Sequence, residues 1–139
     1  MASTSETGDG PPLIELREVT RVFTLGDDTV RAVASANLRI RRGEYCSVMG
    51  PSGSGKSSLL NLIALLDRPT SGQYLLNGRD VTALADDELA AVRNRTIGFV
   101  FQSFQLLARL TAAQNVELPL LLAGLAPRER ETRVREALA

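Results

Sequence analysis

The sequence predicts an α/β fold, with strands and helices arranged around a glycine-rich loop. Three observations support this prediction. Residues 13–49 contain short apolar runs that alternate as β-strands do, residues 50–58 (GPSGSGKSS) are rich in glycine, and the rest of the chain holds several runs with helical composition. Of the 139 residues, 44% are hydrophobic and 23% are charged, which is typical of a folded domain.

Charge and composition argue against several classes of protein. Sixteen basic and sixteen acidic residues cancel, so no net charge favours nucleic acid or an anionic membrane. No apolar run approaches the roughly 18 residues that span a bilayer, and the N-terminus lacks a signal-peptide pattern, so we expect a cytosolic chain. The single cysteine, Cys46, lies in an apolar run, where a small buried residue is favoured over a reactive thiol.

The chain before the loop is expected to begin disordered and then to form strands. Residues 1–12 (MASTSETGDGPP) are small and polar and end in two prolines, which predicts a disordered leader before a folded part at 13–139. A turn is expected at Gly26-Asp27-Asp28. The predicted strands are residues 13–23, 30–33, 36–40 and 44–49, the last leading into the loop.

The glycine-rich stretch fits the phosphate-loop pattern G-x-x-x-x-G-K-[ST] at Gly50, Gly55, Lys56 and Ser57. In this pattern backbone N–H groups cradle phosphates, lysine reaches the outer phosphates and serine coordinates Mg2+. Lys56 is the only lysine among the sixteen basic residues. A chance match is the alternative, but the apolar runs on both sides favour a true loop. The predicted nucleotide-binding residues are Gly50, Pro51, Ser52, Gly53, Ser54, Gly55, Lys56, Ser57 and Ser58.

The segments after the loop alternate between helix and strand. Residues 55–66 are apolar on nearly every side apart from Asn61, so we expect a helix buried between layers. Residues 73–76 and the Asn77-Gly78 turn predict a short hairpin. A helix is expected at 86–94; the carboxylates of its first turn favour the helix dipole over a metal site. An apolar strand at 97–101 ends at Gln102.

Two further helices are predicted near the C-terminus. The first covers residues 111–125 and is kinked or restarted at Pro119. The second begins at Pro127, and its pairs Glu129 with Arg133 and Glu131 with Arg135 have favourable four-residue spacing. No helix stop signal precedes the last residue, so we expect the chain to be a piece of a longer one.

Residues 45–72 and 86–121 strongly resemble the ATP-binding cassette (ABC) ATPases, especially the subgroup that drives lipoprotein release and macrolide export. The resemblance implies a P-loop NTPase fold of the ABC type. This chain would supply about the first half of a cassette. It would contain an N-terminal antiparallel β portion, the start of the core parallel sheet and the beginning of the helical subdomain.

The resemblance also implies roles for individual residues. Residues 50–58 would be the Walker A loop, and Gln102 would be the Q-loop glutamine that touches Mg2+ and the attacking water. Lys56 and Gln102 would then be catalytic, with Ser57 and Gln102 at the metal. Phe23 would stack on adenine, the alternative being a core phenylalanine; for Gln102 the alternative is an exposed polar residue. The sequence departs from the family at Ser58, where Thr is usual, at Ser103, where Gln is common, and at Gln114, which replaces an acidic residue.

Several family motifs do not occur in these 139 residues. There is no LSGGQ signature, no Walker B strand with its catalytic glutamate, and no histidine to serve as the switch. Asp67 follows an apolar run, but it comes eleven positions after Lys56, too soon for a return to a parallel strand. We therefore interpret Asp67 as a helix-end residue, and we expect the chain alone to hold nucleotide without hydrolysing it.

The implied function is that of an ATP-binding subunit. The intact protein would bind MgATP, pair head to tail with a second nucleotide-binding domain, and power a membrane-embedded permease, with no role for nucleic acid. It would lie in the cytoplasm on the inner face of the membrane. Apolar residues at 104, 106, 107 and 118–122 would face the permease or pack within the helical subdomain. Two alternatives remain from the sequence: a nucleotide-binding fragment without turnover, and a kinase or GTPase with the same loop.

Overall fold

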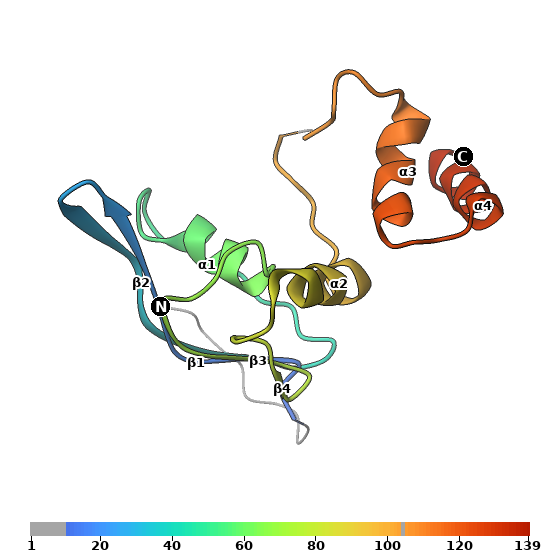
Figure 1. Cartoon of the computed structure of the whole chain (residues 1–139). Helices are drawn as coiled ribbons and strands as arrows, with labels where there is room; N and C mark the ends of the chain where they lie inside the picture. The colour runs from blue at the N-terminus through green and yellow to red at the C-terminus, as the bar shows by residue number, and fades with distance from the viewer. Residues whose placement is uncertain (1–10, 104) are drawn as a thin grey trace. The chain divides into compact units, whose positions relative to one another are not determined.

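A computed structural model describes residues 11–103 and 105–139. The chain divides into two compact units, the first ending at Leu89 and the second formed by Ala90–Ala139. Residues 1–10 of the predicted leader lie outside the described residues. The elements in chain order are β1 (Ile14–Leu25), β2 (Asp28–Ile40), α1 (Lys56–Ile63), β3 (Ser71–Leu76), β4 (Arg79–Asp80), α2 (Asp86–Thr96), α3 (Ala112–Leu122) and α4 (Pro127–Leu138) (Figure 1).

The sheet of the first unit is antiparallel, with the strand order β2-β1-β3-β4 among the described residues. β1 and β2 form a long hairpin, so the two strands predicted at 30–33 and 36–40 are parts of one. Arg21 pairs with Val33 and Val22 with Arg31, which leaves Ala32 as the extra residue of a β-bulge. The predicted Asn77-Gly78 turn is confirmed between β3 and β4.

Helix α1 packs one face against this sheet (Figure 1). Leu62 is its buried residue, and it joins Leu16, Val19 and Tyr74 as the most completely buried large side chains of the described chain. The Tyr74 hydroxyl donates a hydrogen bond of 2.8 Å to the carbonyl oxygen of Ile63, at the end of α1. Leu60 is exposed, so the prediction that this helix is buried between layers is wrong: the sheet covers one face.

The two runs expected to begin a parallel sheet, 44–49 and 97–101, do not form strands. Tyr45 is 95% exposed and Val100 is 96% exposed, so neither run is enclosed as a central strand would be. A parallel strand needs adjacent strands to bond its backbone groups, and within the described residues neither run has such a partner. The α/β class is confirmed, but every strand pairing in this part of the chain is antiparallel.

Helices α2, α3 and α4 begin within one residue of their predicted starts, whereas α1 and α3 each end three residues before their predicted ends, and the predicted restart at Pro119 is wrong. α2 extends two residues beyond the predicted end, and the boundary between the units falls inside it. α3 is continuous through Pro119 and is capped by Thr111, whose side chain accepts from the Gln114 N–H while the Gln114 side chain bonds back to Thr111. α4 begins at Pro127 as predicted, with both expected ion pairs present: Glu129–Arg133 at 2.7 Å and Glu131–Arg135 at 3.0 Å.

Candidate functional site

The glycine-rich loop leads directly into α1, so the N-terminal backbone N–H groups of the helix face the loop. Gly55 is the N-cap residue and has a left-handed backbone, with φ of 84°. A Cβ atom at this position would lie 2.1 Å from the carbonyl oxygen of Ala32, the bulge residue of β2. Only glycine fits this contact, which holds the loop close to the hairpin.

Lys56 is the first residue of α1, and its side chain reaches back across the loop. Its ammonium group donates to the carbonyl oxygen of Pro51 at 2.5 Å and lies 3.4 Å from the hydroxyl of Ser54. Ser57 and Ser58 follow in the first turn of the helix, and Ser57 is exposed. The loop therefore places one full positive charge, a helix N-terminus and exposed hydroxyl groups together.

Two hollows border the loop. One, of about 600 Å³, is lined by residues 52–58 and by Val30, Arg31 and Ala32 of β2. The other, of about 260 Å³, is lined by Gly50, Pro51, Val48, Met49 and parts of β2 and α1. The residues that line the two hollows include both Lys56 and Arg31 and no carboxylate. This distribution of charge suits an anion.

Arg31 borders the candidate site and was not predicted from the sequence. It lies next to the bulge on β2, lines the larger hollow, and makes no ion pair with the other described residues. Nothing in the local sequence distinguishes it from the fourteen other arginines. Only the packing of β2 against the loop brings it to the hollow.

Phe23 lies on β1 and pairs across the hairpin with Val30, which lines the larger hollow. Residues directly opposite one another in an antiparallel pair share one face of the sheet. The ring of Phe23 is 36% exposed, so it does not belong to the buried core, and the Arg21 guanidinium lies 4.3 Å from the ring centroid. The proposed stacking on adenine remains a prediction, but the ring has a free surface.

The carboxylates of Asp67, Asp86 and Glu88 form ion pairs or backbone hydrogen bonds. Asp67 follows α1 and forms an ion pair of 2.7 Å with Arg21, as expected for a helix-end residue. Asp86 pairs with Arg68, and Glu88 accepts from the Ala85 backbone N–H. No group of three metal-ligating side chains occurs among the residues that the structure describes.

Gln102 belongs to the second unit, where it is exposed, and its role at the site stays a prediction. The expected permease-facing residue at position 104 lies outside the described residues. Cys46 is half-buried and has a free thiol, so it is less buried than predicted.

Tyr74 connects the sheet to the helix that carries the loop. Burial raises the pKa of Tyr74 from 10.0 to about 12. The buried hydroxyl donates its hydrogen bond to the carbonyl oxygen of Ile63. This bond joins the end of α1 to β3.

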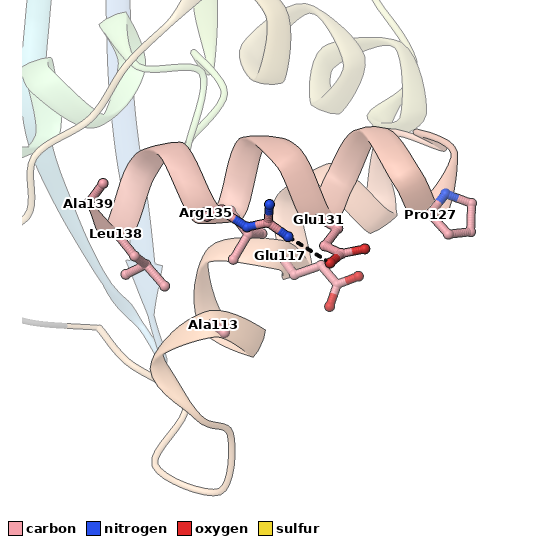
Figure 2. A pocket seen from close by; sticks show the side chains of 8 residues that line it. Ala113, Glu117, Pro127, Glu131, Arg135, Leu138 and Ala139 are labelled. Atoms are coloured by element: carbon pink, nitrogen blue, oxygen red, sulfur yellow. Dashed lines mark hydrogen bonds and ion pairs between the residues drawn. The ribbon is translucent and has the colours of Figure 1, made fainter.

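A further hollow of about 710 Å³ lies between α3 and α4 in the second unit (Figure 2). Its charged lining residues are already paired: Glu131 with Arg135 at 3.0 Å, and Glu117 with Arg130 at 2.9 Å. The rest of its lining is apolar or small. The phosphate loop, where the N-terminus of α1 and the ammonium group of Lys56 lie together, is the better candidate site.

Comparison with known families matches residues 33–139 to the family described as "ABC transporter". This range includes the whole of the loop and Gln102.

The chain is similar to several curated proteins. It is 53% identical over 126 residues to the "Uncharacterized ABC transporter ATP-binding protein YknY" of Bacillus subtilis (strain 168), with 91% of this chain and 55% of that protein covered. It is 51% identical over 127 residues to the "Macrolide export ATP-binding/permease protein MacB" of Marinobacter nauticus, with 91% and 20% covered. The chain spans about half the length of the first relative and a fifth of the second.

Solved structures show the same relationship. The fold matches the ATP-binding cassette MJ0796, in a dimeric post-hydrolysis state bound to ADP and Pi, with a TM-score of 0.79 and 44% identity. The match covers 90% of this chain and 55% of that one. A second structure, described as dimeric MJ0796, a bacterial ABC transporter cassette, matches equally well. These similarities confirm the predicted resemblance and argue against a kinase or GTPase.

Proposed function

This chain belongs to the ABC transporter family as an ATP-binding domain, and from that premise we propose that it binds MgATP at residues 50–58 to power a membrane transporter. The main support for this proposal is that the glycine-rich loop runs directly into the N-terminus of α1. α1 begins at the loop with Lys56 as its first residue, beside a hollow whose lining is positively charged.

The phosphates of ATP would lie at the N-terminus of α1. There the helix dipole and the unpaired N–H groups attract negative charge. The ammonium group of Lys56, which bonds the neutral carbonyl of Pro51, would turn to the outer phosphates instead. A hydrogen bond between two charged groups is stronger than one to a neutral carbonyl, so this exchange favours binding.

The residues of the loop suit Mg2+. Ser57 offers a hydroxyl oxygen, and Mg2+ prefers oxygen ligands and is commonly held by few side chains together with substrate phosphates. Ser57 and Gln102 would hold the ion, whose chemistry is to neutralise charge on the phosphates. Lys56 and Gln102 would then act in phosphoryl transfer, Lys56 by stabilising charge and Gln102 by orienting water.

We further propose two protein partners. The MJ0796 structures are described as dimeric, which supports pairing of this domain with a second nucleotide-binding domain. The MacB relatives are named ATP-binding/permease proteins, which supports coupling to a permease at the inner face of the membrane. Leu106, Leu107, Leu121 and Leu122 are exposed and would serve as contacts. Within the described residues, no helix has the length and hydrophobicity needed to cross a bilayer.

Isothermal titration calorimetry with MgATP tests the proposal. Lys56→Ala removes the one full charge inside the loop, and we expect affinity to fall about tenfold or more, since a charge-assisted hydrogen bond contributes roughly 1.5 to 3 kcal/mol. Arg128→Ala is the matched control, because it removes an exposed positive charge from the first turn of α4. Equal affinities of parent and Lys56→Ala would show that nucleotide does not bind at the loop.

A further inference from the structure

We propose that Arg21, anchored by Asp67, is a positioning residue that holds the ring of Phe23 in place for adenine. The inference rests on the proposed function, in which Phe23 stacks on the base of ATP. It adds two residues to the site, and neither of them touches the phosphate loop. The reasons lie in three contacts of the first unit.

The first contact is between Arg21 and Phe23. The two residues are two apart on β1, so their side chains lie on the same face of the sheet. The guanidinium carbon of Arg21 is 4.3 Å from the centroid of the Phe23 ring, within the range of a cation–π interaction. Arg21 thus covers one face of a ring that is 36% exposed, and the exposed part is left for a ligand.

The second contact fixes Arg21. Its Nε atom donates to Oδ2 of Asp67 at 2.7 Å, and both side chains are largely buried, with 24% and 22% of their surface exposed. An ion pair so enclosed is less screened and less mobile than a surface pair. The guanidinium plane therefore has a defined position beside the ring.

The third contact fixes Asp67. Its backbone N–H donates to the Asn61 carbonyl at 3.3 Å, and its Oδ1 accepts from the Arg68 backbone N–H at 2.8 Å. Asp67 is thereby attached to the end of α1, the helix whose start carries Lys56. One short helix would set the phosphate position at its first turn and, through Asp67 and Arg21, the base position beyond its last turn.

A ring already held in place loses less conformational freedom when a base stacks on it, which favours binding. Loss of the Arg21 side chain should therefore weaken binding of the base and leave binding of the phosphates unchanged. We expect Arg21→Gln to weaken ATP binding about three- to tenfold, because ordering one side chain on binding costs about 0.5 to 1.5 kcal/mol. Affinity for inorganic tripolyphosphate, which has no base, should equal that of the parent.

The experiment measures both ligands by calorimetry on the purified chain and its variants. Arg21→Lys keeps a cation near the ring and should recover part of the loss for ATP, which a purely steric role of Arg21 would not predict. Arg17→Gln is the matched control: it changes an arginine of the same strand whose partner, Glu15, keeps its bond to Arg39. Should Arg21→Gln fail to fold, Asp67→Asn carries the same test, with the same selective weakening of ATP expected.

A double-mutant cycle with Phe23→Ala tests whether Arg21 affects ATP affinity through the ring of Phe23. If Arg21 acts through the ring, Arg21→Gln will have no further effect on ATP affinity once the ring is gone. Equal weakening of ATP and tripolyphosphate, or an undiminished effect in the Phe23→Ala background, would overturn the inference. If Phe23→Ala itself leaves ATP affinity unchanged, the proposed stacking fails; if it weakens ATP and Arg21→Gln does not, only the positioning role fails.

Discussion

A methyl group added at Gly55 should strongly destabilise the first unit. The new Cβ atom would lie 2.1 Å from the carbonyl oxygen of Ala32, roughly 1 Å closer than carbon and oxygen ordinarily approach. Both atoms belong to fixed positions, one at the N-cap of α1 and the other in a β-bulge, so neither can turn aside. The helix and the hairpin would have to separate.

The expected size follows from two terms. A residue other than glycine in the left-handed region costs about 1 to 2 kcal/mol, and overpacking costs about 1 to 3 kcal/mol. Gly55→Ala should therefore destabilise the fold by about 2 to 5 kcal/mol. Gly53→Ala is the matched control, because Gly53 has a similar φ of 78° but no atom within 4 Å of its added Cβ; it should cost only about 1 to 2 kcal/mol.

Urea unfolding followed by circular dichroism measures both variants. We expect a lower midpoint for Gly55→Ala than for Gly53→Ala, together with weaker ATP binding, because the start of α1 moves. Equal destabilisation by the two substitutions would refute the argument that contact with Ala32 sets the position of the loop.

Two further predictions concern Tyr74 and Arg31. Because burial raises the pKa of Tyr74 to about 12, ionisation above pH 10 favours the unfolded chain; stability is complete below pH 10 and should fall by roughly 2 to 3 kcal/mol between pH 10 and 12. Urea unfolding of Tyr74→Phe should give a lower free energy of unfolding at neutral pH but a smaller decrease between pH 10 and 12. An equal decrease in the parent and in Tyr74→Phe would show that Tyr74 does not cause the pH dependence. Arg31→Gln should weaken ATP and tripolyphosphate alike by about fivefold, roughly 1 kcal/mol, since Arg31 lines the phosphate-side hollow. Calorimetry that finds only ATP affected would place Arg31 at the base instead.

Local signals in the sequence predicted the elements well. Some short patterns favour one backbone geometry whatever surrounds them. The structure confirms the elements predicted from three of these: Pro127 at a helix start, the Asn77-Gly78 turn, and the loop pattern that ends at Ser57 and leads into α1. The four-residue spacing of Glu129 and Arg133 likewise requires only a helix.

Features that depend on distant neighbours were not predictable in the same way. The apolar runs at 44–49 and 97–101 have strand composition, but pairing requires a partner, which composition does not supply. The burial of α1 on one face depends on the area of sheet beneath it. The placement of Arg21 and Arg31 follows from the register of the hairpin and its bulge at Ala32, which no single segment specifies.

The most direct test of the account is a structure of the chain with ATP and Mg2+. We predict that the phosphates lie at the first turn of α1, with the ammonium group of Lys56 moved from the Pro51 carbonyl to the outer phosphates, and that adenine lies on the face of Phe23 opposite Arg21. Nucleotide bound away from residues 50–58, or adenine without contact to Phe23, would contradict it.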